Sequence, residues 1–143
     1  MRAWITDAPI DVAAVLDEVG SRSDGAVLLF LGTVREQNEG RAVSGLRYDA
    51  YVAMAEQVLS EIATEAARRL GTERIAAVHR IGELAVGEVS VALAVSAPHR
   101  EQVFVAGRYL IEEIKRRLPV WKREHYVAGE PGWLAGVVPP GYE

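Results

Sequence analysis

A basic corner near the C-terminal end of the sequence is the chain's strongest chemical feature. Residues 115–124, KRRLPVWKRE, include six charged side chains, five of them basic. Pro119 restricts the backbone between two lysines, and Trp121 can exclude water beside them. Two converging lysines with no carboxylate between them repel each other, and a bound anion relieves that repulsion. The corner is therefore a candidate anion site, although a solvated helix face can have the same composition.

Lys115 lies near the end of a helix that the apolar periodicity predicts over residues 98–118. On the helical wheel it flanks the apolar stripe beside Ile111 and Leu118. Its ammonium group is therefore expected at the edge of the core. The alternative is a side chain whose methylene stem only covers apolar surface while its charge stays in water.

Lys122 follows the proline corner on a strand predicted over residues 120–127. In a strand, Lys122 and Glu124 face one side, whereas Trp121 and Arg123 face the other. A lysine at the helix end and a second lysine on the next strand can therefore converge on one pocket.

His99 and Arg100 form a second cationic pair at the beginning of the same predicted helix. Ser96 or Ala97 is expected to cap this helix, with Pro98 in its first turn. Free backbone N–H groups and the helix dipole favour an anion there, and Arg100 can add a two-pronged contact to a phosphate. The alternative is that His99 only packs and that Arg100 pairs with a nearby glutamate.

Arg35 is a third candidate, placed where an apolar run ends. The run GAVLLFLGTV predicts a buried strand that ends at Gly32 and Thr33, and Arg35 opens the polar loop after it. An arginine at a strand end beside a loop can clamp an anion, but alone it decides nothing.

The composition bounds the class of protein. The 143 residues are half hydrophobic and one quarter charged, which fits one globular domain over residues 1–143. No apolar run reaches the roughly 18 residues of a membrane span, and the start MRAWITDAPIDV lacks a secretory pattern, so we expect a cytoplasmic protein. The absence of cysteine excludes thiolate catalysis, so any sulfur in the chemistry must come from elsewhere.

The distribution of charge narrows the choice of ligand. A net charge of −4 argues against general nucleic-acid binding. Residues 99–125 nevertheless contain seven basic and four acidic side chains, so the rest of the chain is strongly acidic. This asymmetry indicates one anionic ligand or partner surface. His79, His99 and His125 lack the close spacing of a metal-ligand motif, which argues against a metal hydrolase.

The remaining sequence predicts the elements that must position these residues. Apolar periodicity indicates helices over residues 9–20, with Pro9 in the first turn, over 52–70, stopped by Gly71, and over 98–118. Strands are expected over 25–34, 44–51, 74–82, 89–96 and 120–127, with a turn over 83–88. The order, roughly β-α-β-β-α-β-β-α-β, favours an α+β fold with a mixed, largely antiparallel sheet and two main helices.

Several motifs, taken in order, resemble one known family. GTVREQNEG, YDAYVAMAE, HRIGELAVGE, SAPHREQVF and IKRRLPVWKRE, followed by GEPGW, resemble the large, catalytic subunits of molybdopterin synthase, the MoaE family. Each motif alone is weak, but their order and the seven-residue spacing of the two lysines are specific. The resemblance extends over nearly the whole chain, from about residue 4 to residue 133.

The resemblance implies a fold, an activity and partners. The implied fold is the α/β hammerhead, an α+β architecture, and the implied enzyme is a sulfurtransferase of molybdenum cofactor biosynthesis. Such enzymes convert cyclic pyranopterin monophosphate into molybdopterin by installing a dithiolene. The sulfur arrives as a thiocarboxylate on the C-terminal Gly-Gly of a small ubiquitin-like subunit. Two large subunits pair and carry a small subunit at each end, and no metal or further cofactor is implied.

The resemblance also implies the site residues. The family's substrate-binding positions fall on Thr33, Val34, Arg35, His99, Arg100, Lys115, Lys122, Arg123 and Glu124, and Lys115 and Lys122 are the implied catalytic residues. Arg35, His99 and Arg100 would hold the phosphate while the lysines face the sulfur donor. The alternative function is a non-catalytic module that binds a ubiquitin-like tail or a phosphorylated metabolite.

Overall fold

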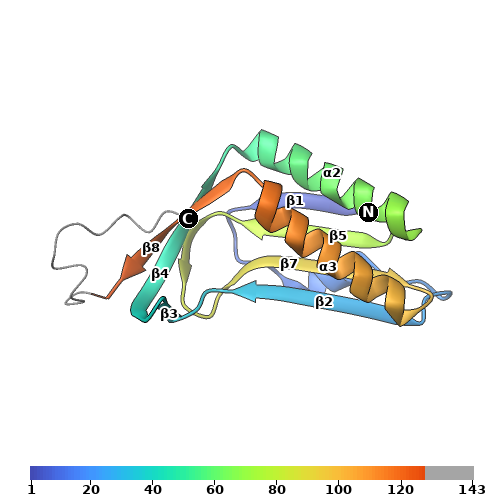
Figure 1. Ribbon diagram of the computed structural model, residues 1–143, viewed down its shortest axis with the longest axis horizontal. Coiled ribbons are helices and arrows are strands. Elements are labelled where there is room, and N and C mark those ends of the chain that lie inside the picture. The colour runs from blue at the N-terminus through green and yellow to red at the C-terminus, as the bar shows by residue number, and fades with distance from the viewer. Residues whose placement is uncertain (128–143) are drawn as a thin grey trace.

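The main sheet of the computed structural model, which describes residues 1–127, has four strands (Figure 1). In spatial order they are β1 (Arg2–Thr6), β5 (Ile75–Arg80), β7 (Val89–Ala97) and β2 (Ala26–Thr33). β1 runs parallel to β5, whereas β7 runs antiparallel to both of its neighbours. β2 therefore forms one edge of this sheet.

Helices cover both faces of the main sheet. The elements are α1 (Val12–Asp17), α2 (Val52–Leu70) and α3 (Arg100–Arg117). α2 and α3 pack on one face and α1 on the other. None of the helices within residues 1–127 has the length and apolar character that crossing a membrane requires.

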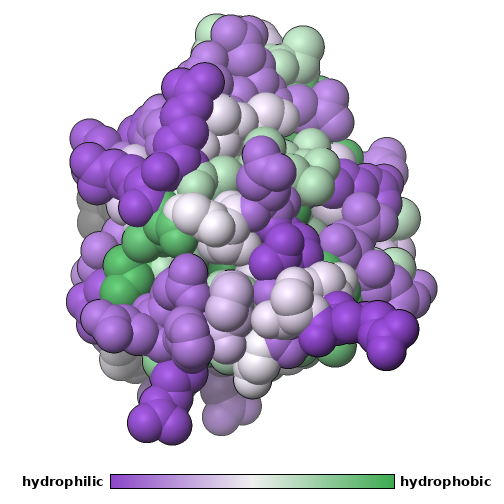
Figure 2. Space-filling model, turned by 90° about the vertical axis from the view of Figure 1, so that its right-hand side faces the viewer, coloured by the Kyte–Doolittle hydropathy of each residue, from purple (hydrophilic) through white to green (hydrophobic). Residues whose placement is uncertain are grey.

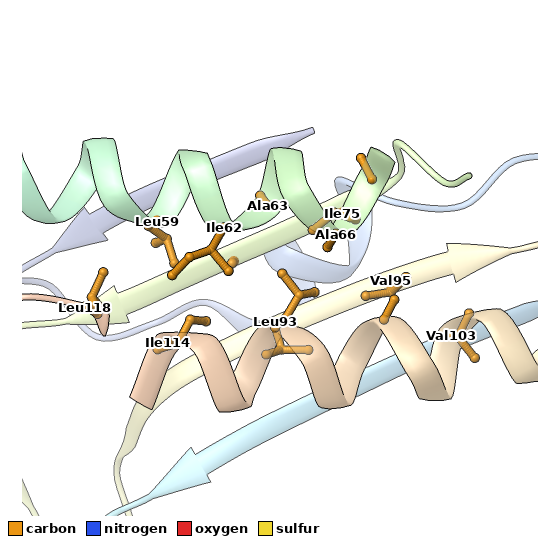
Figure 3. Packing of buried hydrophobic residues seen from close by; sticks show 14 of the residues in the cluster. Leu59, Ile62, Ala63, Ala66, Ile75, Leu93, Val95, Val103, Ile114 and Leu118 are labelled. Atoms are coloured by element: carbon orange, nitrogen blue, oxygen red, sulfur yellow. The ribbon is translucent and has the colours of Figure 1, made fainter. Parts of the chain in front are cut away.

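The larger core lies between the main sheet and the two long helices. Leu59 and Ile62 of α2 and Ile114 of α3 point into this layer together with Leu93 of β7 (Figure 3). All four side chains are at most 3% exposed. Side chains alternate along each strand, so the other face of β5 and β7 packs against α1 in a smaller cluster.

A second, smaller sheet lies beyond one end of the main sheet (Figure 1). Its strands are β3 (Gln37–Asn38), β4 (Arg41–Ala50), β6 (Gly82–Ala85) and β8 (Val120–Tyr126). β4 pairs antiparallel with each of the other three. Val34, Leu46 and Leu84 form a small core beneath it. Because β8 follows α3 directly, the end of that helix lies where the two sheets meet.

The structure confirms the predicted α+β class and most of its elements. The helix over residues 52–70 has the predicted bounds, and Gly71 ends it in the left-handed conformation with φ 68°. Every predicted strand is present, although β4 begins three residues earlier than expected. Leu118, before Pro119, leaves the helix with φ −66° and ψ 125°, as the proline predicts. The motif GEPGW, part of the family resemblance, lies outside the described residues.

Two predictions about strands are wrong. Part of the segment 83–88 expected as a turn is strand β6, whose partner β4 lies far away in the sequence. The strand expected to be buried, β2, is largely uncovered: Val27 is 55% exposed and Leu31 38%. An apolar run can indicate a buried strand, but an edge strand keeps one side open unless something covers it.

The helix caps also differ from the prediction. Pro9, predicted in the first turn, lies before α1, which begins at Val12. Asp11 caps this helix, and its carboxylate accepts a hydrogen bond from the Ala14 backbone N–H at 3.2 Å. His99 itself is the cap of α3, in a reciprocal arrangement with Gln102. Ser96 is instead buried, and its hydroxyl donates to Asp24 at 2.7 Å. The Ser96–Asp24 hydrogen bond joins the end of β7 to the segment that precedes β2.

Glu65 links the two long helices, and this link makes stability depend on pH. Arg117 donates two hydrogen bonds to its carboxylate, at 2.6 and 3.0 Å, and the Tyr109 hydroxyl donates a third at 2.7 Å. Hydrogen bonds from Arg117 and then Tyr109 lower the pKa of Glu65 to about 2. A carboxylate whose pKa falls on folding stabilises the fold above its unfolded pKa and loses that contribution as pH drops.

We expect Glu65→Gln to lower the melting temperature at pH 7 and to have a shrinking effect as pH falls. The window lies between the ordinary glutamate pKa of 4.5 and about 2. Thermal melts of both proteins from pH 7 to pH 2.5 measure it. Gln57→Ala, on an exposed side chain of the same helix, is the control. A difference that stays constant down to pH 2.5 would contradict the assignment.

Candidate active site

A cavity of about 360 Å³ lies where the main sheet, the end of α3 and the small sheet meet. This volume is within the range of small-molecule sites. Its lining residues are Gly32, Thr33, Val34, Arg35, Leu46, Tyr48, His79, Ser90, Val91, Ile111, Ile114, Lys115, Leu118, Val120, Trp121, Lys122 and Glu124. Six of the nine residues predicted for substrate binding are among them.

The corner at Pro119 brings the two lysines to this cavity. The last turn of α3 holds Leu118 through a backbone hydrogen bond to Ile114 at 3.0 Å, and the chain then enters β8. Lys115 and Lys122 both line the cavity, as their positions in helix and strand predict. Trp121 and Ile111 contribute apolar surface beside them. The two lysines therefore converge on one cavity, as predicted from their positions in the helix and the strand.

The pairing of β8 with β4 orients the strand residues of the site. Lys122 lies opposite Tyr48 in the register, and all three of Lys122, Tyr48 and Glu124 line the cavity. Glu124 is only 7% exposed, and its carboxylate accepts hydrogen bonds from the Asn38 side chain and from the Tyr126 hydroxyl. Arg123 points to the other face, where it is exposed, and does not line the cavity.

The cations of the cavity differ from those around it. Arg116 pairs with Glu113, and Arg117 pairs with Glu65, on the outside of α3. Within the described part of the chain, no ion pair joins Arg35, Lys115 or Lys122 to a carboxylate. Three unpaired cations beside one glutamate leave an excess of positive charge. Such a cavity favours an anionic ligand.

The choice between lysine and arginine is a further signal in the sequence. The chain contains fourteen arginines but only two lysines, and both lysines line this cavity. Arginine stays protonated, whereas lysine can give up a proton and act as a nucleophile or base. The rarity of lysine in this sequence is therefore enough to mark both residues as candidates for a chemical role.

His99 and Arg100 lie away from the cavity. They stand at the beginning of α3, sixteen and fifteen residues before Lys115, which corresponds to about 23–24 Å along the helix axis. Both side chains are exposed. Figure 2 looks onto this end of the molecule, which hydrophilic residues cover for the most part. Within one chain, these two residues cannot contact a ligand held between Arg35 and the lysines.

Three polar residues of the cavity were not predicted from the sequence: Tyr48, His79 and Ser90. His79 is only 5% exposed and lies edge-on to Tyr48, with 4.7 Å between the ring centroids. The available signal was a histidine at the end of an otherwise apolar strand, AAVHR. Among residues 1–127, no three histidine, aspartate or glutamate side chains gather as metal ligands would.

Comparison with known proteins points to one family. The family model described as "MoaE protein" matches residues 5–117. The molybdopterin synthase catalytic subunit of Halalkalibacterium halodurans is 44% identical over 129 residues, which cover 90% of this chain and 83% of the relative.

Two solved structures are similar in fold. Molybdopterin synthase from Staphylococcus aureus superposes with a TM-score of 0.83 at 38% identity, covering 88% of this chain and 92% of that one. A complex of subunits 1 and 2 of molybdopterin-converting factor from Helicobacter pylori gives a TM-score of 0.71 at 22% identity, covering 90% and 91%. The second likeness concerns the fold alone.

Proposed function

The chain belongs to the MoaE family, and from this membership we propose that it is the catalytic subunit of a molybdopterin synthase. It transfers sulfur from the C-terminal thiocarboxylate of a small ubiquitin-like subunit to cyclic pyranopterin monophosphate. The product is the dithiolene of molybdopterin. Cytoplasmic residence and a single domain over residues 1–143 remain predictions from the sequence.

The observation that carries this proposal is the set of unpaired cations in one cavity. The substrate brings a cyclic phosphate and the donor brings a thiocarboxylate, so two anions must meet in one place. Arg35, Lys115 and Lys122 line that place without carboxylate partners, and they offset the repulsion between the anions. Ile111 and Trp121 add apolar surface to the wall of the cavity beside these cations.

Each cation has a distinct proposed role. Arg35 binds the phosphate, because its guanidinium group can form two parallel hydrogen bonds to phosphate oxygens. Lys115 and Lys122 face the sulfur donor, with Lys122 nearer the incoming tail. A carboxyl-terminal Gly-Gly tail is thin enough to enter a cavity that a folded domain cannot enter. Because the chain has no cysteine, this tail is the source of the sulfur.

Self-association would cover the open edge of the main sheet. Along β2 and the adjoining part of α3, Val27, Phe30, Leu31, Phe104 and Val105 are all at least 36% exposed. A groove lined by both elements runs beside them. An exposed, apolar edge strand is a surface that proteins ordinarily cover. We assign this surface to the contact between two copies of the chain.

A twofold axis across β2 also accounts for His99 and Arg100. Ala97, just before them, lies opposite Ala26 at the start of β2, whereas Arg35 follows the end of that strand. A twofold contact makes the two copies of β2 antiparallel, so the start of one lies beside the end of the other. The strand length of about 26 Å matches the 24 Å that separates the two clusters. His99 and Arg100 of a second copy thereby reach the phosphate.

The direct test is anaerobic reaction of the purified chain with the pterin precursor and thiocarboxylated small subunit. We expect dithiolene product, detected after oxidation as a fluorescent pterin. A small subunit that lacks its last two glycines should dock with only modest weakening and give no product. Absence of product with the intact donor would favour the alternative, a non-catalytic module that binds such a tail or a phosphorylated metabolite.

Arg35→Ala and Arg100→Ala are each expected to weaken binding of the pterin precursor about ten- to a hundredfold. A hydrogen bond between charged groups contributes about 1.5–3 kcal/mol, which corresponds to that range. Calorimetry with the unreactive precursor alone measures the affinity. Arg68→Ala, at an exposed position on α2 outside the cavity, is the control. Unchanged affinity in both variants would show that the phosphate binds elsewhere.

A further inference from the structure

His79 is a buried polar residue that the proposed roles leave unused. It lies on β5 on the same face as Ile75 and Ala77, which belong to the larger core. This row of side chains ends at the cavity, where His79 and Lys115 are both lining residues. The ring is 5% exposed, so its contacts are fixed by the fold. A polar group placed there requires a reason, because apolar residues fill the rest of the row.

The hydrogen bonds of the ring define its tautomer. Nδ1 lies 2.8 Å from the backbone carbonyl oxygen of Arg80. A carbonyl oxygen can only accept, so Nδ1 carries the proton of the neutral ring, and Nε2 is left with a free lone pair. No residue within 1–127 forms a hydrogen bond with Nε2. The ring therefore offers one unused acceptor at the cavity wall.

Electrostatics keep this ring neutral and connect it to Lys115. Burial lowers the pKa of His79 to about 4, the Arg80 carbonyl opposes that shift, and the positive charge of Lys115 adds to it. Near pH 7 the imidazole is thus uncharged. The charged groups that share its cavity are Arg35 after β2, Lys115 on α3, and Lys122 and Glu124 on β8, and Tyr48 on β4 packs against its ring.

We propose that His79 is a positioning residue for Lys115, whose ammonium group donates a hydrogen bond to Nε2 when substrate and donor are bound. A carboxylate could also orient the lysine, but it would cancel the positive charge that the two anions need. A neutral imidazole orients Lys115 and leaves its charge intact. This inference rests on the proposed sulfur transfer, and it concerns a residue that does not itself touch the reacting atoms.

Two substitutions of His79 distinguish a role in positioning Lys115 from a role in packing alone. His79→Gln keeps an acceptor oxygen near the position of Nε2, whereas His79→Phe keeps a ring of similar size and removes the acceptor. Both variants lose the hydrogen bond to the Arg80 carbonyl, so that cost is common to them. If His79 only fills space, phenylalanine is the better replacement, because it matches the size and shape of the imidazole ring. If His79 positions Lys115, glutamine is better for turnover. The two roles therefore predict opposite orders.

We expect His79→Phe to lower kcat about ten- to a hundredfold with KM for the pterin precursor changed by less than about twofold. His79→Gln should recover most of that loss, and the two variants should melt at similar temperatures, somewhat below the wild type, because both lose the hydrogen bond to the Arg80 carbonyl. Equal kcat in wild type and His79→Phe, or a larger loss in His79→Gln, would overturn the inference. Turnover by the wild type in the same assay tests the sulfur transfer separately.

A spectroscopic measurement tests the tautomer without any turnover. In protein labelled with ¹⁵N-histidine, the two ring nitrogens have different shifts according to which one carries the proton. We expect a protonated Nδ1 and a bare Nε2 at pH 7, with no titration of this ring down to pH 5. A protonated Nε2, or a ring that titrates near pH 6.5, would overturn the inference even if the wild type gave no product.

Discussion

Replacing Lys115 with alanine should abolish dithiolene formation while the protein stays folded. Lys115 is an exposed side chain that lines the anion cavity and has no carboxylate partner among the described residues. Removal of a group that moves a proton or attacks the donor costs about 10²–10⁴ in rate. Single-turnover product formation with thiocarboxylated donor measures the loss. Lys115→Arg should also fail, because arginine keeps the charge but does not readily release a proton.

The neighbouring residue supplies a matched control. Arg116 is exposed, pairs with Glu113 and lies outside the cavity, so Arg116→Ala should retain most of the activity. The circular dichroism spectra of all three variants should match that of the wild type. A well-folded Lys115→Ala protein with most of its turnover intact would reject a central role for this lysine.

Two chains with different defects should restore activity to each other when they are forced into one dimer. If His99 and Arg100 of one copy complete the cavity of the other, a dimer of Lys115→Ala with Arg100→Ala contains one intact site. Its second site lacks both residues. Heterodimers isolated through two different affinity tags should therefore show about half of the wild-type rate. The rate is measured at a precursor concentration well below the KM of the Arg100→Ala protein.

The control heterodimer combines two chains whose substituted residues both belong to the cavity of their own chain. Lys115→Ala combined with Lys122→Ala leaves one lysine missing at each site, so that heterodimer should stay inactive. If His99 and Arg100 act within their own chain, or play no part, the first heterodimer will gain nothing beyond the mean of its two parents. Light scattering establishes beforehand whether the chain forms dimers.

Local features of the chain could be predicted, and long-range relations could not. The apolar stripe of α2 and its end at Gly71 both lie within one short stretch of sequence. The bounds of this helix therefore follow from periodicity and backbone preference. The convergence of Lys115 and Lys122 depends on seven residues and one proline, which is also local. By contrast, β6 is a strand because it pairs with β4, whose residues lie about forty positions away. Nothing within ELAVGE indicates that partner.

The same contrast between local and long-range features explains which site residues could be predicted from the sequence. His79 reaches the cavity because β5 lies inside the main sheet, a fact of topology that the stretch AAVHR does not contain. His99 and Arg100 share a basic region of the sequence with the lysines, but a straight helix carries them to the opposite end of the molecule. One side of β2 is exposed because this strand lies at the edge of the sheet. The periodicity of the sequence does not predict the position of a strand within a sheet.

The restriction of lysine to the cavity has a consequence for chemical selectivity. An activated carboxyl group acylates primary amines far more readily than guanidinium groups. In this chain the side-chain amines are those of Lys115 and Lys122, and both line the cavity. A reactive carboxyl terminus therefore meets no competing side-chain amine elsewhere on the chain. Each substitution of a surface arginine by lysine would create such a competitor. Any transfer of an acyl group from the donor to a lysine side chain of this chain would therefore have to take place in the cavity.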